Sequence, residues 1–255
     1  PNDVFTICSI VCELQAALRI VDETYKSPNA RSNGDDNNYT LARIGRRNVF
    51  ILCVKECSTS LAATATEKVK LTFPNVELFL LAGIAAGVPS ETHDIRLADI
   101  VVSPGVIKYD FGKMESDGFV RTGALNKPHE ALLNVVDTLK APFKSINKAS
   151  PTDDTGGSSN PVNRPPCEST NSLIHYDTIA SGDIVVKNKT FCGKVLKKDN
   201  ILCFEMEAAG FMESCQSRHS RYLRLRQIIQ EQELATVYCI RRCRICQSYS
   251  SCLFK

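Results

Sequence analysis

Short apolar, β-rich runs alternate along this chain with segments whose apolar residues have helical spacing. Val4 to Ile10 predicts a first buried strand, and Glu13 to Val21 predicts the helix that follows it. Val76 to Leu81 and Ile100 to Ser103 predict further buried strands. Strands that alternate with helices predict an α/β fold, built as a three-layer αβα sandwich.

Not all strands of the predicted sheet should be parallel. Tyr39 to Ile44 and Val49 to Val54 flank the turn-forming residues Gly45 to Asn48, which predicts a hairpin with a four-residue turn. The central sheet should therefore be mixed. Further elements are predicted as helices at Ser60 to Leu71 and His129 to Leu139, and as ordered structure from Leu173 to Ala180.

Length and composition favour one main domain. A chain of 255 residues can bury one sizeable core, and its apolar runs are shorter than the ~20 residues that span a bilayer. Residues 145–170 are polar and should form a connector within a domain at 1–213. Cys8, Cys12, Cys53 and Cys203 lie inside apolar runs, where a reduced thiol behaves as a small hydrophobe, so we expect a cytoplasmic protein.

The stretch from Cys203 to Gly210 places two carboxylates around a thioether, where an apolar run becomes a small-residue helix. A ribose site needs a carboxylate that accepts hydrogen bonds from two hydroxyls and an apolar side chain for the carbon face of the sugar. On this stretch alone, a helix start with acidic residues in its first turn is the favoured interpretation.

Four other motifs accompany this stretch in a fixed order. Together the five motifs resemble the purine and uridine phosphorylase/nucleosidase superfamily, and its fungal branch in particular. The resemblance covers about residues 3 to 213 and rests on Gly83 to Pro89, His93 to Ser103, Tyr109 to Lys113, Ile179 to Gly182 and Glu205 to Gly210.

The resemblance implies a site that cleaves a ribose–base bond. Glu13 matches the carboxylate that activates water, and Met206 and Glu207 match the pair that contacts the ribose, with Glu207 counted among the catalytic residues. The remaining implied residues are Asp183, Val185 and Val186 beside the base, and Gly83, Ile84 and Ala85 in a turn that binds phosphate or another anion.

The sequence leaves hydrolysis and phosphorolysis open. The family has consecutive glycines where this chain has Ala85-Ala86-Gly87, and a second glycine-bearing turn aligns with the glycine-free stretch Glu56 to Ser60. Because added methyl groups narrow an anion cradle, hydrolysis is slightly favoured. Phosphate stays a potential co-substrate, and neither a metal nor an organic cofactor is expected.

Two motif segments carry no expected catalytic role. His93, Asp94, Arg96 and Asp99 are expected to form a polar entry to the strand Ile100 to Ser103. The Tyr109 to Lys113 motif marks the fungal branch without suggesting a physical role.

The resemblance ends near Glu213. Residues 214–255 form a basic tail rich in Cys and Arg, with eight Lys/Arg and two Asp/Glu. Ser220 to Leu225 is what the family's Ile-Arg-Gly-Ile-Cys-Asp would give if its codons were read two bases late, and Gln230 to Tyr238 yields the next family motif when the same shift is undone. We infer a frame-shifted tail, so that the family's C-terminal strand and helix should be missing or non-native, together with the Asp that assists the leaving base.

The sequence leads to three hypotheses, of which two assign a function and one assigns none. The leading hypothesis is an enzyme-derived domain, impaired in this chain, that cleaves purine nucleosides or nucleotides and does not bind nucleic acid or membranes. A homo-oligomer is compatible with it. The alternatives are a non-catalytic nucleoside sensor, since fungal relatives carry this domain beside ankyrin or NACHT-type regions, and the product of a decayed gene.

Overall fold

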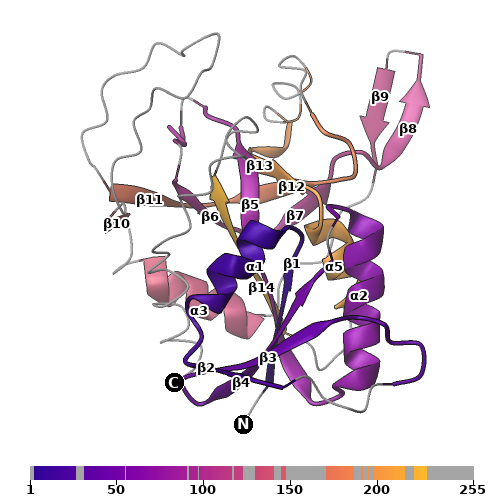
Figure 1. Ribbon diagram of the computed structural model, residues 1–255. Helices are drawn as coiled ribbons and strands as arrows, with labels where there is room; N and C mark the ends of the chain where they lie inside the picture. Colours follow the sequence, from indigo (N-terminus) through magenta and orange to yellow (C-terminus); the bar gives the residue numbers. More distant parts are fainter. Residues whose placement is uncertain are drawn as a thin grey trace.

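A computed structural model describes residues 3–26, 32–54, 56–90, 92–96, 98–116, 118–122, 130–140, 145–147, 171–186, 191, 195, 198–215 and 221–228. Helices separate runs of strands along this part of the chain (Figure 1). The helices are α1 (Val11–Leu18), α2 (Thr59–Thr72), α3 (Glu130–Lys140) and α5 (Ala208–Ser214). The strands are β1 (Asp3–Cys8), β2 (Glu23–Tyr25), β3 (Tyr39–Ile44), β4 (Arg47–Cys53), β5 (Val76–Gly87), β6 (Ile100–Val102), β7 (Val106–Lys108), β8 (Gly112–Glu115), β9 (Gly118–Arg121), β10 (Ser145–Asn147), β11 (Asn171–Tyr176), β12 (Thr178–Ser181), β13 (Ile201–Glu205) and β14 (Arg221–Ile228).

The central sheet is mixed, as predicted. β1 pairs in parallel with both β4 and β5, whereas β3 and β4 form the antiparallel hairpin. The hairpin turn is two residues rather than the four predicted, because Ile44 pairs directly with Arg47. Gly45 has a φ of 58°, which a tight hairpin turn needs and which glycine adopts without strain.

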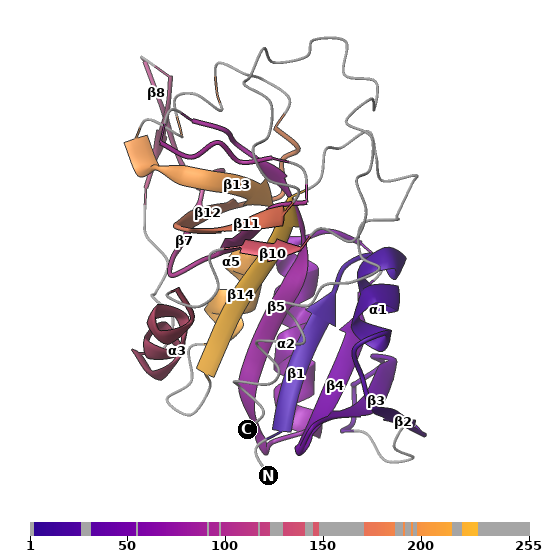
Figure 2. The ribbon, with the colours of Figure 1, turned by 90° about the vertical axis from the view of Figure 1, so that its left-hand side faces the viewer.

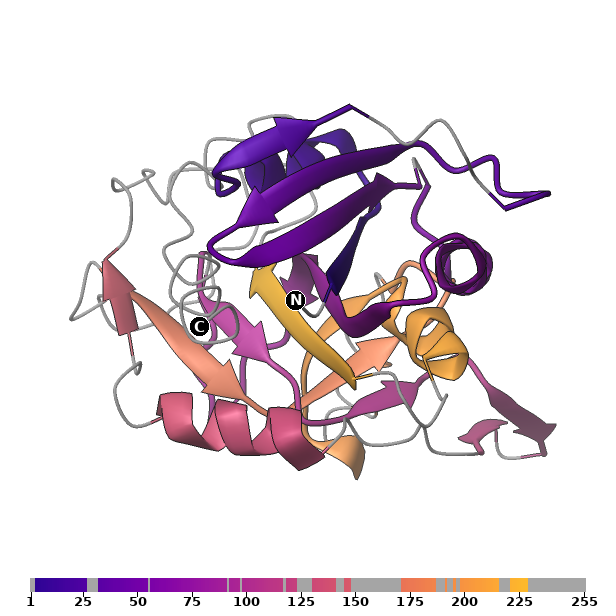
Figure 3. The ribbon, with the colours of Figure 1, turned by 90° about the horizontal axis from the view of Figure 1, so that it is seen from below.

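Helices cover both faces of the sheet, which confirms the three-layer αβα sandwich. In Figure 2, α1 and α3 lie in front of the sheet and α2 and α5 behind it, and Figure 3 shows α2 beside α5 from below. Two apolar cores separate the layers. The α1 side includes Val4, Cys8 and Val136, and the α2–α5 side includes Phe5, Ala62 and Phe211.

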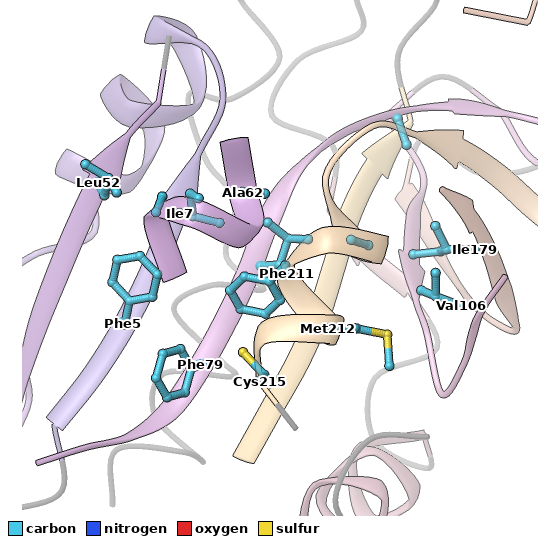
Figure 4. Close-up of a cluster of buried hydrophobic side chains, with 14 of the residues drawn as sticks. Phe5, Ile7, Leu52, Ala62, Phe79, Val106, Ile179, Phe211, Met212 and Cys215 are labelled. Carbon is cyan, nitrogen blue, oxygen red and sulfur yellow. The ribbon is translucent and has the colours of Figure 1, made fainter. Parts of the chain in front are cut away.

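The core on the α2–α5 side is built from rings that meet edge to face. Figure 4 shows Phe5 on β1, Phe79 on β5 and Phe211 on α5 side by side. The Phe5 and Phe79 centroids are 5.8 Å apart, and those of Phe79 and Phe211 are 6.4 Å apart. Such edge-on pairs add to the burial of large apolar surfaces and fix how α5 sits on the sheet.

β5 joins two parts of the sheet. Its first half pairs with β1, and its last residues, Ala86 and Gly87, pair in antiparallel fashion with Phe204 and Cys203 of β13. β13 also pairs in parallel with β12, and β12 pairs in parallel with β7. The 12-residue length of β5 therefore brings the end of β1 and the end of β13 to the same region.

The C-terminal strand position of the sheet, expected to be missing or non-native, is occupied. β14 runs parallel to β5 from Arg221↔Leu78 to Ile228↔Ala85, and antiparallel to β6. Its sequence, RYLRLRQI, is not the apolar strand of the family, so the strand is non-native in sequence rather than missing. The family's last helix would fall in residues 229–255, outside the described residues.

Other expectations hold with small shifts. α2, β6 and α3 lie within two residues of their predicted bounds. The predicted connector begins with the short strand β10, and residues 148–170 lie outside the described residues. No helix within the described part of the chain is long and apolar enough to cross a membrane.

Candidate functional site

Glu13 joins the end of β1 to the middle of β5. It is the third residue of α1, and its side chain is 6% exposed. One carboxylate oxygen accepts the backbone N–H of Ser9 at 2.7 Å and of Ile10 at 3.4 Å, and the other accepts the N–H of Ile84 at 2.8 Å. The bond to Ile10 is a local helix cap, because Ile10 is the N-cap residue of α1. The bond to Ile84 goes beyond it, since a local cap does not reach a residue 71 positions away.

The Gly83 to Gly87 segment is an extended strand and not a turn, which corrects the prediction. Gly83, Ile84 and Ala85 pair with Arg226, Gln227 and Ile228 of β14. The small side chains suit a strand with close neighbours on both sides. The Ile84 N–H, which was expected to face an anion, is aimed instead at the carboxylate of Glu13.

Met206 and Glu207 come to the same edge through the register of β13. Phe204 pairs with Ala86 in antiparallel fashion, so the chain after Phe204 runs back toward Ala85 and Ile84. The side chain of Glu207 is 3% exposed, and Met206 is half-buried. The strand ends thus bring the predicted ribose pair toward the Glu13–Ile84 contact.

The two acidic residues of this motif have different tasks. Glu205 accepts the N–H groups of Glu207 at 3.2 Å and of Ala208 at 2.9 Å, so it serves the start of α5. Glu207 is the N-cap residue of α5, but its side chain forms no capping hydrogen bond to that helix within the described residues. The helix-start interpretation therefore applies to Glu205, and Glu207 stays the candidate sugar ligand.

Asp183 holds the N-terminus of α2. Its carboxylate accepts the Thr59 N–H at 2.7 Å and the Thr59 hydroxyl at 2.5 Å. Partial burial acts to raise the pKa of Asp183, but hydrogen bonds from Thr59 and Ser58 and the charge of Lys108 outweigh it and hold the pKa below its usual range. Asp183 lies close to the candidate sugar residues, because the neighbouring Gly182 N–H donates to the Glu205 carbonyl at 3.2 Å.

The other two residues predicted beside the base lie at a partly open rim. Val185 is 51% exposed and Val186 is half-buried against a small core with Tyr109 and Phe204. This core includes Ala180 of β12 and Phe204 of β13, so Val186 packs against that strand pair. The structure thus places both valines beside Asp183 and leaves Val185 facing outward.

The Tyr109 to Lys113 motif, for which the sequence suggested no role, braces the segment that carries Asp183. The Tyr109 hydroxyl donates to the Ile184 carbonyl, and the Asp110 carboxylate accepts the Asp183 N–H at 2.6 Å. Burial, followed by the charge of Asp110, raises the pKa of Tyr109, so its hydroxyl stays a donor. A Cβ on Gly182 would lie 2.7 Å from the Asp110 carboxylate, so a larger residue would displace that carboxylate. Sequence reasoning missed these residues because their partners are more than 70 positions away.

The expected polar entry to β6 is confirmed. Asp99 accepts the N–H groups of Arg96 and Leu173, both at 2.9 Å, and lies 3.0 Å from the His175 ring nitrogen. It therefore ties β6 to β11 and serves the fold. Within the described residues no cluster of His, Cys, Asp and Glu has the arrangement of a metal site.

We expect Asp183→Ala to destabilise the protein by ~1 kcal/mol at pH 7, the usual cost of a lost helix cap. Because the folded protein lowers the pKa of Asp183, this stabilisation is present above the ordinary carboxylate range and is lost as the pH falls through the folded pKa. Urea unfolding of wild type and variant from pH 7 downward should give a difference that shrinks toward acid. An equal difference at every pH would contradict this role.

This arrangement defines a class of protein. Solved structures with the same fold include nucleosidases. The 5'-methylthioadenosine/S-adenosylhomocysteine nucleosidase of Neisseria meningitidis, in complex with methylthio-immucillin-A, matches with a TM-score of 0.65 and 13% identity over 93% of this chain and 90% of that one. A futalosine hydrolase mutant of Helicobacter pylori matches with a TM-score of 0.61 and 16% identity, over 89% of each chain. The chain thus has the fold of the purine and uridine phosphorylase/nucleosidase superfamily, as its motifs predicted.

A fungal relative narrows this further. A nucleotide-binding leucine-rich repeat (NLR)-like protein of Hyaloscypha variabilis is 33% identical over 243 residues, which cover 81% of this chain. The match spans only 24% of the length of that relative, so the relative is a much larger protein. A scan against models of known protein families finds no match.

Proposed function

We propose that this chain is a nucleoside-binding domain that cleaves the N-glycosidic bond of purine nucleosides or nucleotides by hydrolysis. The observation that carries the proposal is the bridge of Glu13 between β1 and Ile84, at the edge toward which β13 directs Met206 and Glu207. Buried carboxylates that converge from separate strand ends suit a sugar and the nucleophile that attacks it.

Each residue has a distinct chemical task in this proposal. Glu13 accepts a proton from the attacking water as the oxygen bonds to the anomeric carbon. Glu207 accepts hydrogen bonds from the ribose hydroxyls, and Met206 packs on the carbon face of the sugar. The bond to the base breaks, its electron pair goes to the base nitrogen, and this nitrogen takes up a proton from solvent, to which Glu13 later returns its own.

Hydrolysis is favoured over phosphorolysis by the charges around the site. Asp183 already fills the N-terminus of α2 with a carboxylate, which is where a phosphate would otherwise find free N–H donors. The Ile84 N–H is likewise taken by Glu13. A second anion would meet carboxylates in place of donors.

The rate should be low in this chain. β14 has no carboxylate in its sequence, RYLRLRQI, where the family has the Asp that assists the leaving base. Loss of a general acid typically reduces the rate ~10²–10⁴-fold. We therefore expect binding of nucleosides with slow cleavage.

Chromatography of adenosine and inosine incubated with the protein tests the proposal. The expected products are the free base and free ribose, at a rate that inorganic phosphate does not change. Ribose 1-phosphate as the product would contradict hydrolysis. No cleavage and no binding of either nucleoside in a calorimeter would contradict the function as a whole.

A second candidate is a nucleoside sensor within a larger signalling protein. It is favoured by the NLR-like relative, of which the matched region is about a quarter. Tight binding of nucleosides without any turnover would support the sensor. Transcript sequence across codons 213 to 220 tests the frame-shift hypothesis separately: a transcript in the family's frame supports the enzyme, and one that encodes β14 as given favours the product of a decayed gene.

A further inference from the structure

Ser9 carries a buried hydroxyl that the fold does not use. It follows the last residue of β1 and is 1% exposed. Among the described residues, its Oγ has no hydrogen-bond partner. Burial of a hydroxyl without a partner is unfavourable, so buried hydroxyls nearly always have one. A buried hydroxyl beside a candidate site, without a partner in the protein, thus indicates a hydrogen-bond partner that is not a protein atom.

Two other buried serines among the described residues have hydrogen-bond partners. The Oγ of Ser103 accepts the Gly105 N–H at 3.1 Å, and the Oγ of Ser181 accepts the Ala209 N–H at 2.8 Å. Both hold a turn or a helix start in place. Ser9 therefore differs from them in having no structural task for its hydroxyl.

The position of Ser9 relative to Glu13 limits what its partner can be. The Ser9 N–H donates to the Glu13 carboxylate at 2.7 Å. Because Oγ is three covalent bonds from that nitrogen, the two oxygens are at most ~6.4 Å apart. One water molecule with two hydrogen bonds of ~2.8 Å spans oxygens up to ~5.6 Å apart. Since Ser9 Oγ makes no direct hydrogen bond, one bridging water molecule fits most of the separations that this geometry allows.

We propose that Ser9 is a positioning residue, whose hydroxyl holds, together with the Glu13 carboxylate, the water molecule that attacks the sugar. This inference rests on the proposed function. The water donates one hydrogen to Glu13, which later takes that proton, and the Ser9 hydroxyl fixes a second direction. A water held at two points has its remaining lone pair oriented for attack on the anomeric carbon.

The surrounding charges select water over an anionic nucleophile. Glu13 is a carboxylate that already draws three backbone N–H groups toward it. A phosphate beside it would be repelled, whereas a neutral molecule that both donates and accepts hydrogen bonds suits a hydroxyl next to a carboxylate. Ser9 thus adds a polar contact that water satisfies.

Ser9→Ala tests this assignment, with Ser103→Ala as the matched control. A high-resolution crystal structure of the wild-type chain should contain an ordered water bonded to Ser9 Oγ and the Glu13 carboxylate, and the Ser9→Ala crystal should lack it. In hydrolysis assays kcat should fall ~10-fold, the lower end of what positioning a reacting group supplies, while KM is unchanged. Ser103→Ala should keep both kinetic values.

Thermal unfolding separates this role from a structural one. Ser9→Ala should melt at or above the wild-type temperature, because no hydrogen bond within the protein is lost, whereas Ser103→Ala should melt lower. A Ser9 hydroxyl bonded to protein atoms in the crystal, or a Ser9→Ala variant that melts lower with unchanged kcat, would overturn the proposal. A bridging water in a protein that cleaves no nucleoside would support the water site and contradict only the proposed function.

Discussion

Gly210→Ala, which adds a single methyl group, should strongly lower the free energy of unfolding of this protein. A Cβ at Gly210 would lie 1.7 Å from the Thr59 carbonyl oxygen and 2.5 Å from the Thr59 carbonyl carbon. These are backbone atoms, so no side-chain rotation relieves the clash, and α5 must move away from α2. Overpacking in a core costs ~1–3 kcal/mol or more, and we expect the upper end of this range.

The shift of α5 should also disturb both the core and the site. The residue after Gly210 is Phe211, which packs on Phe79, and Thr59 is the donor to Asp183. For a chain of this size a loss of ~3 kcal/mol lowers the melting temperature by ~6–12 °C. Calorimetry or circular dichroism on heating measures this.

Gly105→Ala is the matched control. Nothing lies within 4 Å of a Cβ at Gly105, and its φ is not in the left-handed region. It should leave the melting temperature within about a degree, since such surface-like changes stay within ~0.5 kcal/mol. Equal melting temperatures for Gly210→Ala and Gly105→Ala would contradict the close contact of α5 with α2.

Glu13→Gln should have the largest effect on turnover. An amide cannot take up a proton from water at neutral pH, so kcat should fall ~10²–10⁴-fold. The amide also presents an NH₂ group to a backbone N–H that Glu13 now accepts, so we expect a loss of ~1–3 kcal/mol in unfolding free energy. Steady-state kinetics with adenosine and urea unfolding measure the two effects.

Glu205→Gln is the control that separates catalysis from folding. Glu205 is also buried and also accepts backbone N–H groups, but those belong to the start of α5. We expect it to lose stability comparable to Glu13→Gln and far less kcat. Equal losses of kcat in the two variants would mean that Glu13 acts through the fold and not as the base.

The candidate site was predictable where a residue's role depends on its own motif. Glu205, Met206 and Glu207 were identified from one stretch, and the strand before them and the helix after them are as predicted. The sequence did not show which carboxylate serves the helix. That depends on backbone geometry at the helix start, where Glu205 reaches the N–H of Ala208 and Glu207 does not cap.

The segment from Gly83 to Gly87 shows the limit of composition. Small residues favour close backbone approach, which is equally true of an anion-binding turn and of a strand with close neighbours on both sides. Only the assembled sheet decided between them, since β14 and β13 both pair with this segment.

The sequence by itself determined the class of fold, several of its strands and helices, and the motifs that supply the candidate residues, because apolar periodicity and compact motifs are local properties. The tertiary structure alone decided which of these residues meet. Glu13 reaches Ile84, and Asp183 reaches Thr59 across 124 positions. Such contacts are set by strand register and helix packing. Local sequence patterns do not predict them, because the residues in contact lie far apart in the chain.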